Sequence, residues 1–406
     1  MPIDPVRALR LLAARLEPQP AVEYALDEAP RGYTAETIPA AAPVREDRAR
    51  IALRNGFALA PGIAGGDECV ILGTIAVEQS LDAFGRPLTT GAPSVEGRSV
   101  WRVETGAPVP AGAVSILPPA HATLVAPDRI RIGEIPPPGH GLGPVSVPRP
   151  AVPPGSLLDA RLRTFLAATG VRTVRVRPPF EVGVACVGDE IVDLRAPGEG
   201  GRHDLVMPWI EEALARLDLV TVPLGILGDS PEALRRVLLH VMDRKVEVLI
   251  LVGGLGDGIT DRLRESLSRF EAPAAIDGVD ADGCRGLLLA RAVGIDVVAL
   301  GGRPSEAAAA FDLLVRPALL ARRGAGRPLW DWTRASFPLE PSSAAGLKHS
   351  GEGSWLVRPA SLDTSPGGES VVRAWDSPTP FLPLVPPQEG WAVIPPGETL
   401  AYFGRT

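Results

Sequence analysis

The sequence predicts a multidomain α/β protein in which β-rich segments flank one parallel α/β domain. Three observations lead to this fold class. The 406 residues, at about 150 residues per domain, allow two to four domains. Strand and helix patterns alternate between Glu181 and Leu320, which is typical of a parallel sheet covered by helices. Outside that segment, short β-type runs are separated by glycines and prolines, of which the chain has 44 each, as in small β-domains.

The chain begins with a helix and continues as short strands. The helix is predicted to start at Asp4-Pro5, an N-cap acceptor followed by a first-turn proline, and to end near Leu16. Strands are expected over 68–77 and 121–135. A second helix is predicted over Leu157–Ala168, capped by Ser156, and an edge strand over Thr173–Arg177.

Buried strands and amphipathic helices alternate in the following segment. The expected strands are Glu181–Val187, Leu219–Leu224, Val246–Val252 and Asp296–Leu300, with Val246–Val252 central. The expected helices are Asp204–Leu217, Glu232–Arg244, Thr260–Arg269 and Ser305–Leu320. Beyond residue 326, short β-runs predict a small C-terminal β-domain; they are Trp355–Arg358, Ser370–Trp375 and Trp391–Ile394.

Composition excludes several classes of protein. The net charge of −7 disfavours a nucleic-acid partner, which requires a basic face. The strongest apolar run, Val246–Val252, is too short to cross a bilayer. Three widely separated cysteines, Cys69, Cys186 and Cys284, fit neither a zinc site nor a disulfide framework. We therefore expect a cytoplasmic protein with no nucleic-acid or membrane partner.

Glycines and carboxylates follow the predicted strands of the α/β segment. In an open parallel sheet, ligands bind beyond the carboxyl ends of the strands. Four groups stand at such ends: Gly188-Asp189-Glu190, Gly228-Asp229, Gly253–Gly258 and Gly301–Pro304. Glycine-rich backbone N–H groups can hold a phosphate, whereas carboxylates can hold a metal or move a proton. Glycines serve a tight turn equally well, so both interpretations stay open.

The order of these motifs, with two that precede them, resembles that of the molybdopterin molybdenumtransferases, which include the C-terminal region of gephyrin. The segment Thr105–Ala113 reads Thr-Gly-Ala-Pro-Val-Pro-Ala-Gly-Ala and carries the family pattern intact. Four further segments match in part: Arg54–Ala58, Val187–Ile191, Gly253–Asp261 and Gly301–Pro304. The match in order and spacing extends from about residue 5 to 320 and resumes loosely over Gly390–Gly397.

The resemblance implies an elongated homodimer built from four segments. These are a linker domain (1–45 and 141–177), a β-rich insertion (46–140), an α/β molybdopterin-binding domain (178–325) and a C-terminal β-barrel-like domain (326–406). It also implies transfer of molybdate to adenylylated molybdopterin with the help of Mg²⁺. The implied partners are a molybdopterin-type small molecule, a second copy of the chain and a possible molybdoenzyme maturation factor.

The family motifs transfer roles to particular residues of this sequence. The implied catalytic residues are Asn55, Thr105, Glu190, Asp229 and Asp261, with Glu190 and Asp261 as metal ligands. The implied ligand-binding residues are Gly106, Gly188, Asp189, Gly253, Gly254, Gly256, Gly258, Arg285, Gly302, Arg303 and Pro304.

The sequence departs from the family at charged positions. Asn55 and Ile259 stand where the family has aspartates, and Gly139-His140-Gly141 lacks a family carboxylate. Asp280 and Asp282 fall where the family has lysines. Two like charges at roughly 5 Å repel by about 3 kcal/mol at an effective dielectric of 20. Unless Arg285 or Arg303 compensates, we therefore expect weaker phosphate binding, and we expect weak or absent transferase activity. A non-catalytic molybdopterin- or nucleotide-binding paralogue, acting as a carrier or scaffold, is the alternative.

Overall fold

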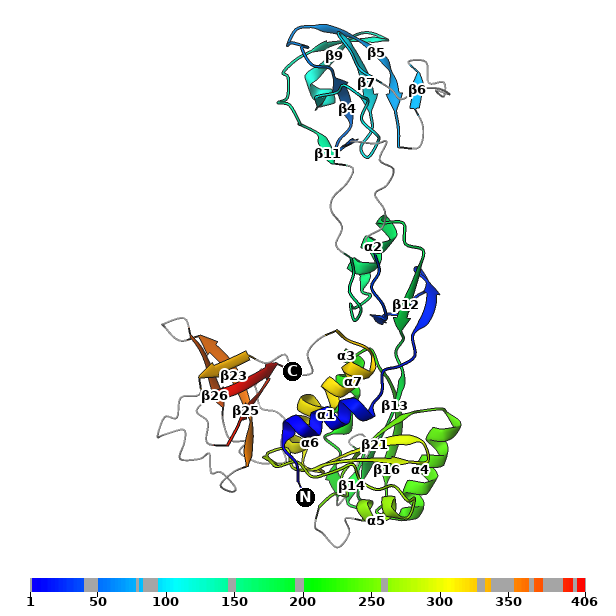
Figure 1. Cartoon of the computed structure of the whole chain (residues 1–406), viewed down its shortest axis with the longest axis vertical. Coiled ribbons are helices and arrows are strands. Elements are labelled where there is room, and N and C mark those ends of the chain that lie inside the picture. The colour runs from blue at the N-terminus through cyan, green and yellow to red at the C-terminus, as the bar shows by residue number, and fades with distance from the viewer. Residues whose placement is uncertain are drawn as a thin grey trace. The chain divides into compact units, whose positions relative to one another are not determined.

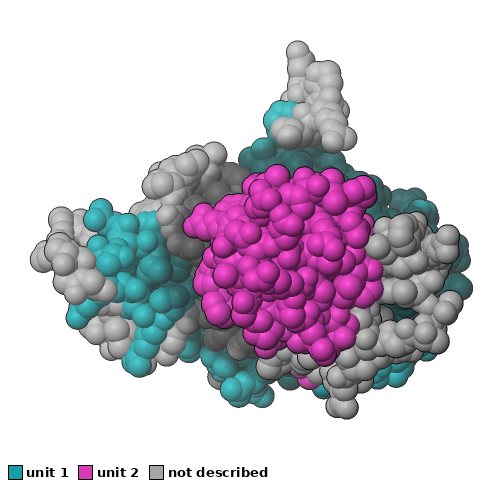
Figure 2. Space-filling view, turned by 90° about the horizontal axis from the view of Figure 1, so that it is seen from above, with its two compact units in different colours: residues 1–38, 152–406 teal, residues 39–151 magenta. Residues whose placement is uncertain are grey.

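The computed structural model divides the chain into two compact units (Figure 2). One comprises Met1–Ile38 and Val152–Thr406, and the other Pro39–Ala151. The structure describes residues 2–39, 50–77, 80–82, 94–144, 151–193, 201–256, 262–326, 333–336, 354–364, 369–374, 390–396 and 400–405. Within these ranges no helix is long and apolar enough to span a membrane.

The larger unit is built around a six-stranded sheet in the order β16-β13-β17-β21-β20-β18. Its strands are β13 (Glu181–Val187), β16 (Val220–Leu227), β17 (Val248–Val252), β18 (Ile276–Asp277), β20 (Leu287–Ala292) and β21 (Ile295–Leu300). The first four strands in the sheet order, β16, β13, β17 and β21, are parallel to one another. Strand β17 lies inside the sheet, as predicted.

The prediction of a wholly parallel sheet was wrong at one edge, where β20 pairs antiparallel with both of its neighbours, β21 and β18. The turn between β20 and β21 is Val293-Gly294, with φ values of 47° and 88°. Two consecutive residues at positive φ give the tight turn that closes a hairpin. Strand β20 reads Leu-Leu-Leu-Ala-Arg-Ala, which has no β-branched residue and so gave no strand signal in the sequence.

Helices cover both faces of the sheet (Figure 1). One face packs on α1 (Pro5–Arg15), α3 (Met207–Arg216) and a long helix made of α6 (Pro304–Ala310), a π-helical turn η2 (Phe311–Val315) and α7 (Arg316–Arg322). The other packs on α4 (Pro231–Asp243) and α5 (Leu263–Ser268). Alternate residues of β13 and β17 enter the two cores, which explains their continuous apolar runs.

The segments next to the sheet match the sequence less closely. Helix α2 spans Ala160–Ala168 and is capped by Asp159, not by Ser156, because the Asp159 side chain accepts from the Leu162 N–H. Strand β12 (Thr173–Arg177) lies between β1 (Val22–Ala25) and β2 (Tyr33–Thr34). It is therefore a central strand, and the prediction of an edge strand was wrong.

The smaller unit is almost entirely β-structure. Its main sheet has the order β8-β4-β7-β5-β10-β9, with β6 added beside β5. The strands are β4 (Gly56–Leu59), β5 (Glu68–Ile75), β6 (Ser80–Asp82), β7 (Ser99–Val103), β8 (Ser115–Leu117), β9 (Ala122–Ala126) and β10 (Arg129–Ile132). A short 3₁₀ turn, η1 (Pro119–His121), precedes β9, and a two-stranded sheet joins β3 (Arg50–Ala52) to β11 (Leu142–Pro144).

The C-terminal β-runs form a second six-stranded sheet in the order β19-β23-β24-β22-β26-β25. Its strands are β19 (Ala281–Asp282), β22 (Thr333–Ser336), β23 (Trp355–Thr364), β24 (Ser370–Ala374), β25 (Gly390–Ile394) and β26 (Leu400–Arg405). Strand β19 precedes β20 of the α/β sheet in the chain, so the two sheets share a covalent connection. Trp391 also donates its indole N–H to Asp312 Oδ2 at 2.9 Å. The remaining short pair is β14 (Ile191–Val192) with β15 (Arg202–His203).

Asp312 makes the stability of this arrangement dependent on pH. Burial raises the pKa of Asp312 to about 6, against the lowering effects of the Trp391 hydrogen bond and of Arg316 and Arg216. A carboxyl whose folded pKa is raised stabilises the fold below its unfolded pKa, and this contribution is lost as the pH rises through about 6. A shift of about two units corresponds to about 3 kcal/mol.

We therefore expect Asp312→Asn to flatten the pH profile of stability, because the amide still accepts the Trp391 N–H but does not titrate. The unfolding free energy of wild type minus that of the variant should rise by about 2 kcal/mol from about pH 7.5 to 4.5. Urea titrations at both pH values measure this difference. Asp243→Asn, at an exposed carboxylate at the end of α4, is the control; parallel profiles of wild type and Asp312→Asn would contradict the prediction.

Candidate functional site

Four loops meet at the carboxyl edge of the parallel strands. They follow β13 (residues 188–190), β16 (228–229), β17 (253–256) and β21 (301–304). The Gly188 N–H donates to Leu227 O at 3.0 Å, and the Gly253 N–H donates to Leu300 O at 2.9 Å. The predicted clustering of the glycine loops at one edge is therefore confirmed for the described residues, although the structure does not test the roles of their side chains.

Gly253 is required where two of these loops approach each other. Its φ is 106°, and a Cβ at this position would lie 2.2 Å from the carbonyl oxygen of Val187. A Cβ on Gly302 would in turn lie 3.4 Å from Gly253 Cα. The close approach of the three backbones is possible because side chains are missing there, and it leaves backbone N–H groups near an open edge.

Asp189 and Asp229 hold the first two loops together through reciprocal hydrogen bonds. The Asp189 N–H donates to Asp229 Oδ2 at 3.1 Å, and the Asp229 N–H donates to Asp189 Oδ1 at 3.3 Å. Carboxylate oxygens of this kind can accept from a ligand or bind a cation. Glu190, the next residue, is exposed.

A buried pair of side chains fixes the start of α3 behind these loops. Asp204 Oδ1 accepts from the backbone N–H groups of Val206 and Met207, each at 3.0 Å, and its Oδ2 accepts from the Cys186 thiol at 3.0 Å. Burial, followed by the Asp204 hydrogen bond, raises the pKa of Cys186. Cys186 is thus a protonated core residue, and its contact with Asp204 was missed because the two residues are 18 positions apart and belong to different elements.

The other predicted ligand-binding residues of this unit differ in their exposure, and one of them lies outside the described residues. Gly302 and Arg303 are exposed at the edge, and Arg303 Nη1 lies 3.0 Å from Glu306 Oε1. Arg285 is exposed close to the same edge, since the Gly301 N–H donates to the neighbouring Gly286 O at 2.8 Å. Gly254, Gly256 and Pro304 are described in these loops. Gly258, Ile259 and Asp261 lie outside the described residues.

Asn55 and Thr105 lie in the smaller unit and contact each other. Asn55 Oδ1 accepts from the Thr105 backbone N–H at 2.7 Å and from the Thr105 hydroxyl at 2.9 Å. Because a backbone N–H can only donate, the amide oxygen of Asn55 must face Thr105. Gly106 follows at φ 85°. The two motifs that the sequence separates by fifty residues thus form one exposed corner.

The two aspartates at the family's lysine positions have partners in the C-terminal sheet. Asp282 Oδ2 lies 2.9 Å from Arg358 Nη2, and Asp280 Oδ1 accepts from the Ser354 hydroxyl at 2.6 Å. The charge of Asp282 is thus paired with a guanidinium, supplied by Arg358 and not by Arg285 or Arg303. The sequence gave no signal for a pair that is 76 residues apart.

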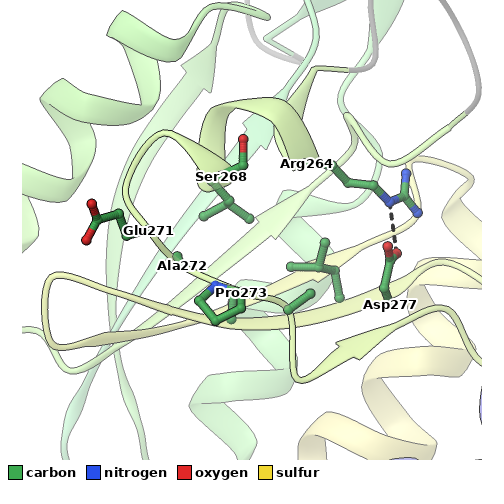
Figure 3. Close-up of a pocket in the computed structure, with 10 residues that line it drawn as sticks. Arg264, Ser268, Glu271, Ala272, Pro273 and Asp277 are labelled. Atoms are coloured by element: carbon green, nitrogen blue, oxygen red, sulfur yellow. Dashed lines mark hydrogen bonds and ion pairs between the residues drawn. The ribbon is translucent and has the colours of Figure 1, made fainter. Parts of the chain in front are cut away.

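A cavity of about 410 Å³ lies away from the edge loops, between α5 and strands β18 and β20 (Figure 3). Its lining is mostly apolar, with Leu267, Leu288 and Ala290 among the lining residues. The Arg264–Asp277 ion pair, at 2.8 Å, stands on one side. None of the candidate site residues that the structure describes lines this cavity.

Oxygen ligands for a hard cation are present at the edge but incomplete in the described residues. Asp189, Glu190 and Asp229 supply carboxylates, which suit Mg²⁺. Among the residues that the structure describes, no three His, Cys, Asp or Glu side chains are arranged as a metal-binding group.

The chain is similar to proteins of molybdenum cofactor biosynthesis. The family model "Probable molybdopterin binding domain" matches residues 183–321. Molybdopterin molybdenumtransferase 1 of Mycobacterium tuberculosis is 27% identical over 335 residues, covering 77% of this chain and 75% of the relative. Molybdopterin molybdenumtransferase of Haemophilus influenzae is 24% identical over 190 residues, covering 46% of each chain.

The fold is that of a known biosynthetic protein over the whole length. Two crystal structures of the molybdopterin biosynthesis protein MoeA of Pyrococcus horikoshii match with TM-scores of 0.69 and 0.66, at 18% and 15% identity. They cover 100% of this chain and 99% and 100% of their own. The matched α/β domain and the shared full-length fold are those expected of a divergent, MoeA-like protein similar to the molybdopterin molybdenumtransferases.

Proposed function

We propose that this chain acts in molybdenum cofactor biosynthesis by binding a molybdopterin-type ligand at the carboxyl edge of its α/β sheet. The convergence of the four edge loops is the observation that carries the proposal. The loops after β13, β17 and β21 approach so closely that Gly253 has no room for a Cβ. Backbone N–H groups brought together in this way suit a phosphate group of the ligand.

Charged residues at this edge would orient the ligand. Arg303 and Arg285 are exposed cations that can pair with phosphate oxygens. Glu190 and Asp229 would supply oxygen ligands to Mg²⁺, together with Asp261. When bound, Mg²⁺ would neutralise charge on a phosphoanhydride. Asn55 and Thr105 of the smaller unit are proposed to contribute to the same reaction.

The reaction we propose is transfer of molybdate to adenylylated molybdopterin, with a turnover lower than that of relatives that retain every family carboxylate. Asn55 and Ile259 remove two negative charges that could hold Mg²⁺ or position molybdate, and a cation site weakens with each carboxylate lost. We also propose a homodimer, the four-segment division given by the resemblance, and a possible molybdoenzyme maturation partner.

Two measurements test the proposed function. Calorimetric titration with adenylylated molybdopterin should show binding that is weakened by Arg303→Ala, and complementation of an insertase-deficient strain should be partial. Arg98→Ala, an exposed arginine of the smaller unit paired with Asp67, is the matched control. Absence of binding by wild type would refute the ligand assignment, whereas full complementation would show that the altered positions do not limit turnover.

A further inference from the structure

A second cavity, of about 260 Å³, lies on the helical side of the larger unit and is lined in part by a half-buried acid. It is lined by residues of α3, of the π-turn η2 and of α7, among them Trp209, Asp312 and Arg316. No residue of the four edge loops lines it, so it is separate from the site of the proposed function. Drug-sized ligands occupy about 300–1,000 Å³, and the smaller volume suits a single fused ring system.

The cavity has a fixed aromatic wall. Trp209 packs edge-to-face on Phe311, with ring centroids 5.4 Å apart and an interplanar angle of 82°. Phe311 is fully buried in the core beneath. Because the indole ring is held in place by the core, it offers a preformed surface for a planar ligand.

The acid at the base of the cavity is held in a defined orientation. Asp312 lies in the π-turn, a departure from α-helical geometry that frequently marks a functional position. Its Oδ2 accepts from the Trp391 indole N–H at 2.9 Å. A carboxylate has about four acceptor sites, so one hydrogen bond leaves capacity for donors from a ligand.

Positive charge lies on the same rim. Arg316 and Arg216 both act on the Asp312 carboxyl electrostatically. Arg216 Nη2 is paired with Glu212 Oε1 at 2.6 Å, and Arg316 follows Asp312 by one helical turn. The cavity thus combines an acceptor for N–H groups, a donor for a carbonyl or anionic oxygen, and an aromatic wall.

We propose that this cavity binds a fused-ring heterocycle with a 2-amino-lactam edge, the pattern shared by guanine and pterin rings. The ring N–H and the exocyclic amino group would donate to Asp312, the lactam oxygen would accept from Arg316, and the ring would contact Trp209. An adenine ring lacks this pair of donors. The cavity would therefore discriminate between purines by hydrogen bonds to a half-buried carboxylate.

Calorimetric titration of the full chain tests the assignment with GMP, pterin-6-carboxylate and AMP as probes. We expect GMP, pterin-6-carboxylate or both to bind at least tenfold more tightly than AMP, and binding of one alone identifies the source of the ligand. Asp312→Asn should weaken that binding at least tenfold, because the amide replaces one acceptor oxygen with a donor. Trp209→Leu should weaken it through loss of the aromatic wall.

Asp243→Asn is the control, since it makes the same chemical change on an exposed carboxylate of α4, and it should leave binding unchanged. Asp312→Asn is expected to keep the fold, and circular dichroism of each variant verifies this. Equal binding of AMP and GMP, or binding insensitive to Asp312→Asn, would overturn the proposal. Binding that is lost in Arg303→Ala but retained in Asp312→Asn would assign the heterocycle to the edge loops, and would overturn this inference while supporting the proposed function.

Discussion

Gly253→Ala should destabilise the larger unit by more than about 3 kcal/mol, the range of severe core and backbone substitutions. The new Cβ would meet the Val187 carbonyl oxygen at 2.2 Å, and the backbone would remain at φ 106°. The loop after β17 would have to move away from β13, which separates the backbones that form the proposed ligand edge. Urea unfolding followed by tryptophan fluorescence measures the loss of stability.

Gly294→Ala is the matched control for this substitution. Gly294 also has a positive φ, 88°, but a Cβ there meets nothing within 4 Å. It should cost only the conformational penalty, about 1–2 kcal/mol. If both variants lose the same stability, close packing of the edge loops is not what requires glycine at 253.

Asp282→Lys should reduce stability by about 3 kcal/mol, because it places an ammonium beside a guanidinium at a partly buried pair. The Asp282 and Arg358 side chains are 26% and 12% exposed, and their pairing joins β19 to β23. The loss should appear as a lower unfolding free energy and as earlier exposure of the C-terminal sheet to proteolysis.

A charge swap provides the decisive comparison for that pair. Asp282→Lys combined with Arg358→Glu should recover a substantial part of the loss, since opposite charges face each other again. Glu68→Lys, at the exposed pair with Arg131, should change stability by no more than about 1 kcal/mol. No recovery in the double variant would mean that the lysine acts through packing and not through charge.

The sequence was sufficient to predict the elements whose patterns are local. Strands β13 and β17 are continuous apolar runs, and Asp4 caps its helix as predicted because the cap, the proline and the apolar spacing are adjacent. Strand β20 was missed because its leucines, alanines and arginine favour helix, whereas β13 and β17 are rich in valine and isoleucine. The π-turn η2 was missed because Phe311–Val315 continues the helical pattern of its neighbours.

The contacts that could not be predicted at the candidate site are those between residues far apart in the sequence. The positions of the glycines directly after the predicted strands were enough to predict that the edge loops lie together, because parallel strands end on one side of the sheet. Arg358 for Asp282, Cys186 for Asp204 and Trp391 for Asp312 are partners from other elements, and no spacing rule connects them. Charge alone therefore suggested repulsion at Asp282, where the fold supplies Arg358.

The point at which the chain leaves and re-enters the larger unit has a consequence for how this protein can be rearranged. The Ile38 N–H donates to Val152 O at 2.9 Å, and the Val152 N–H donates to Ile38 O at 3.0 Å. The two residues that flank the segment Pro39–Ala151 are thus hydrogen-bonded to each other. A short connector between Ile38 and Val152 would close the chain without breaking any strand of the α/β sheet. The segment is therefore an inserted domain whose two connections to the larger unit are adjacent. Such a domain can be removed, expressed alone or replaced by another without changing the fold of the rest of the chain.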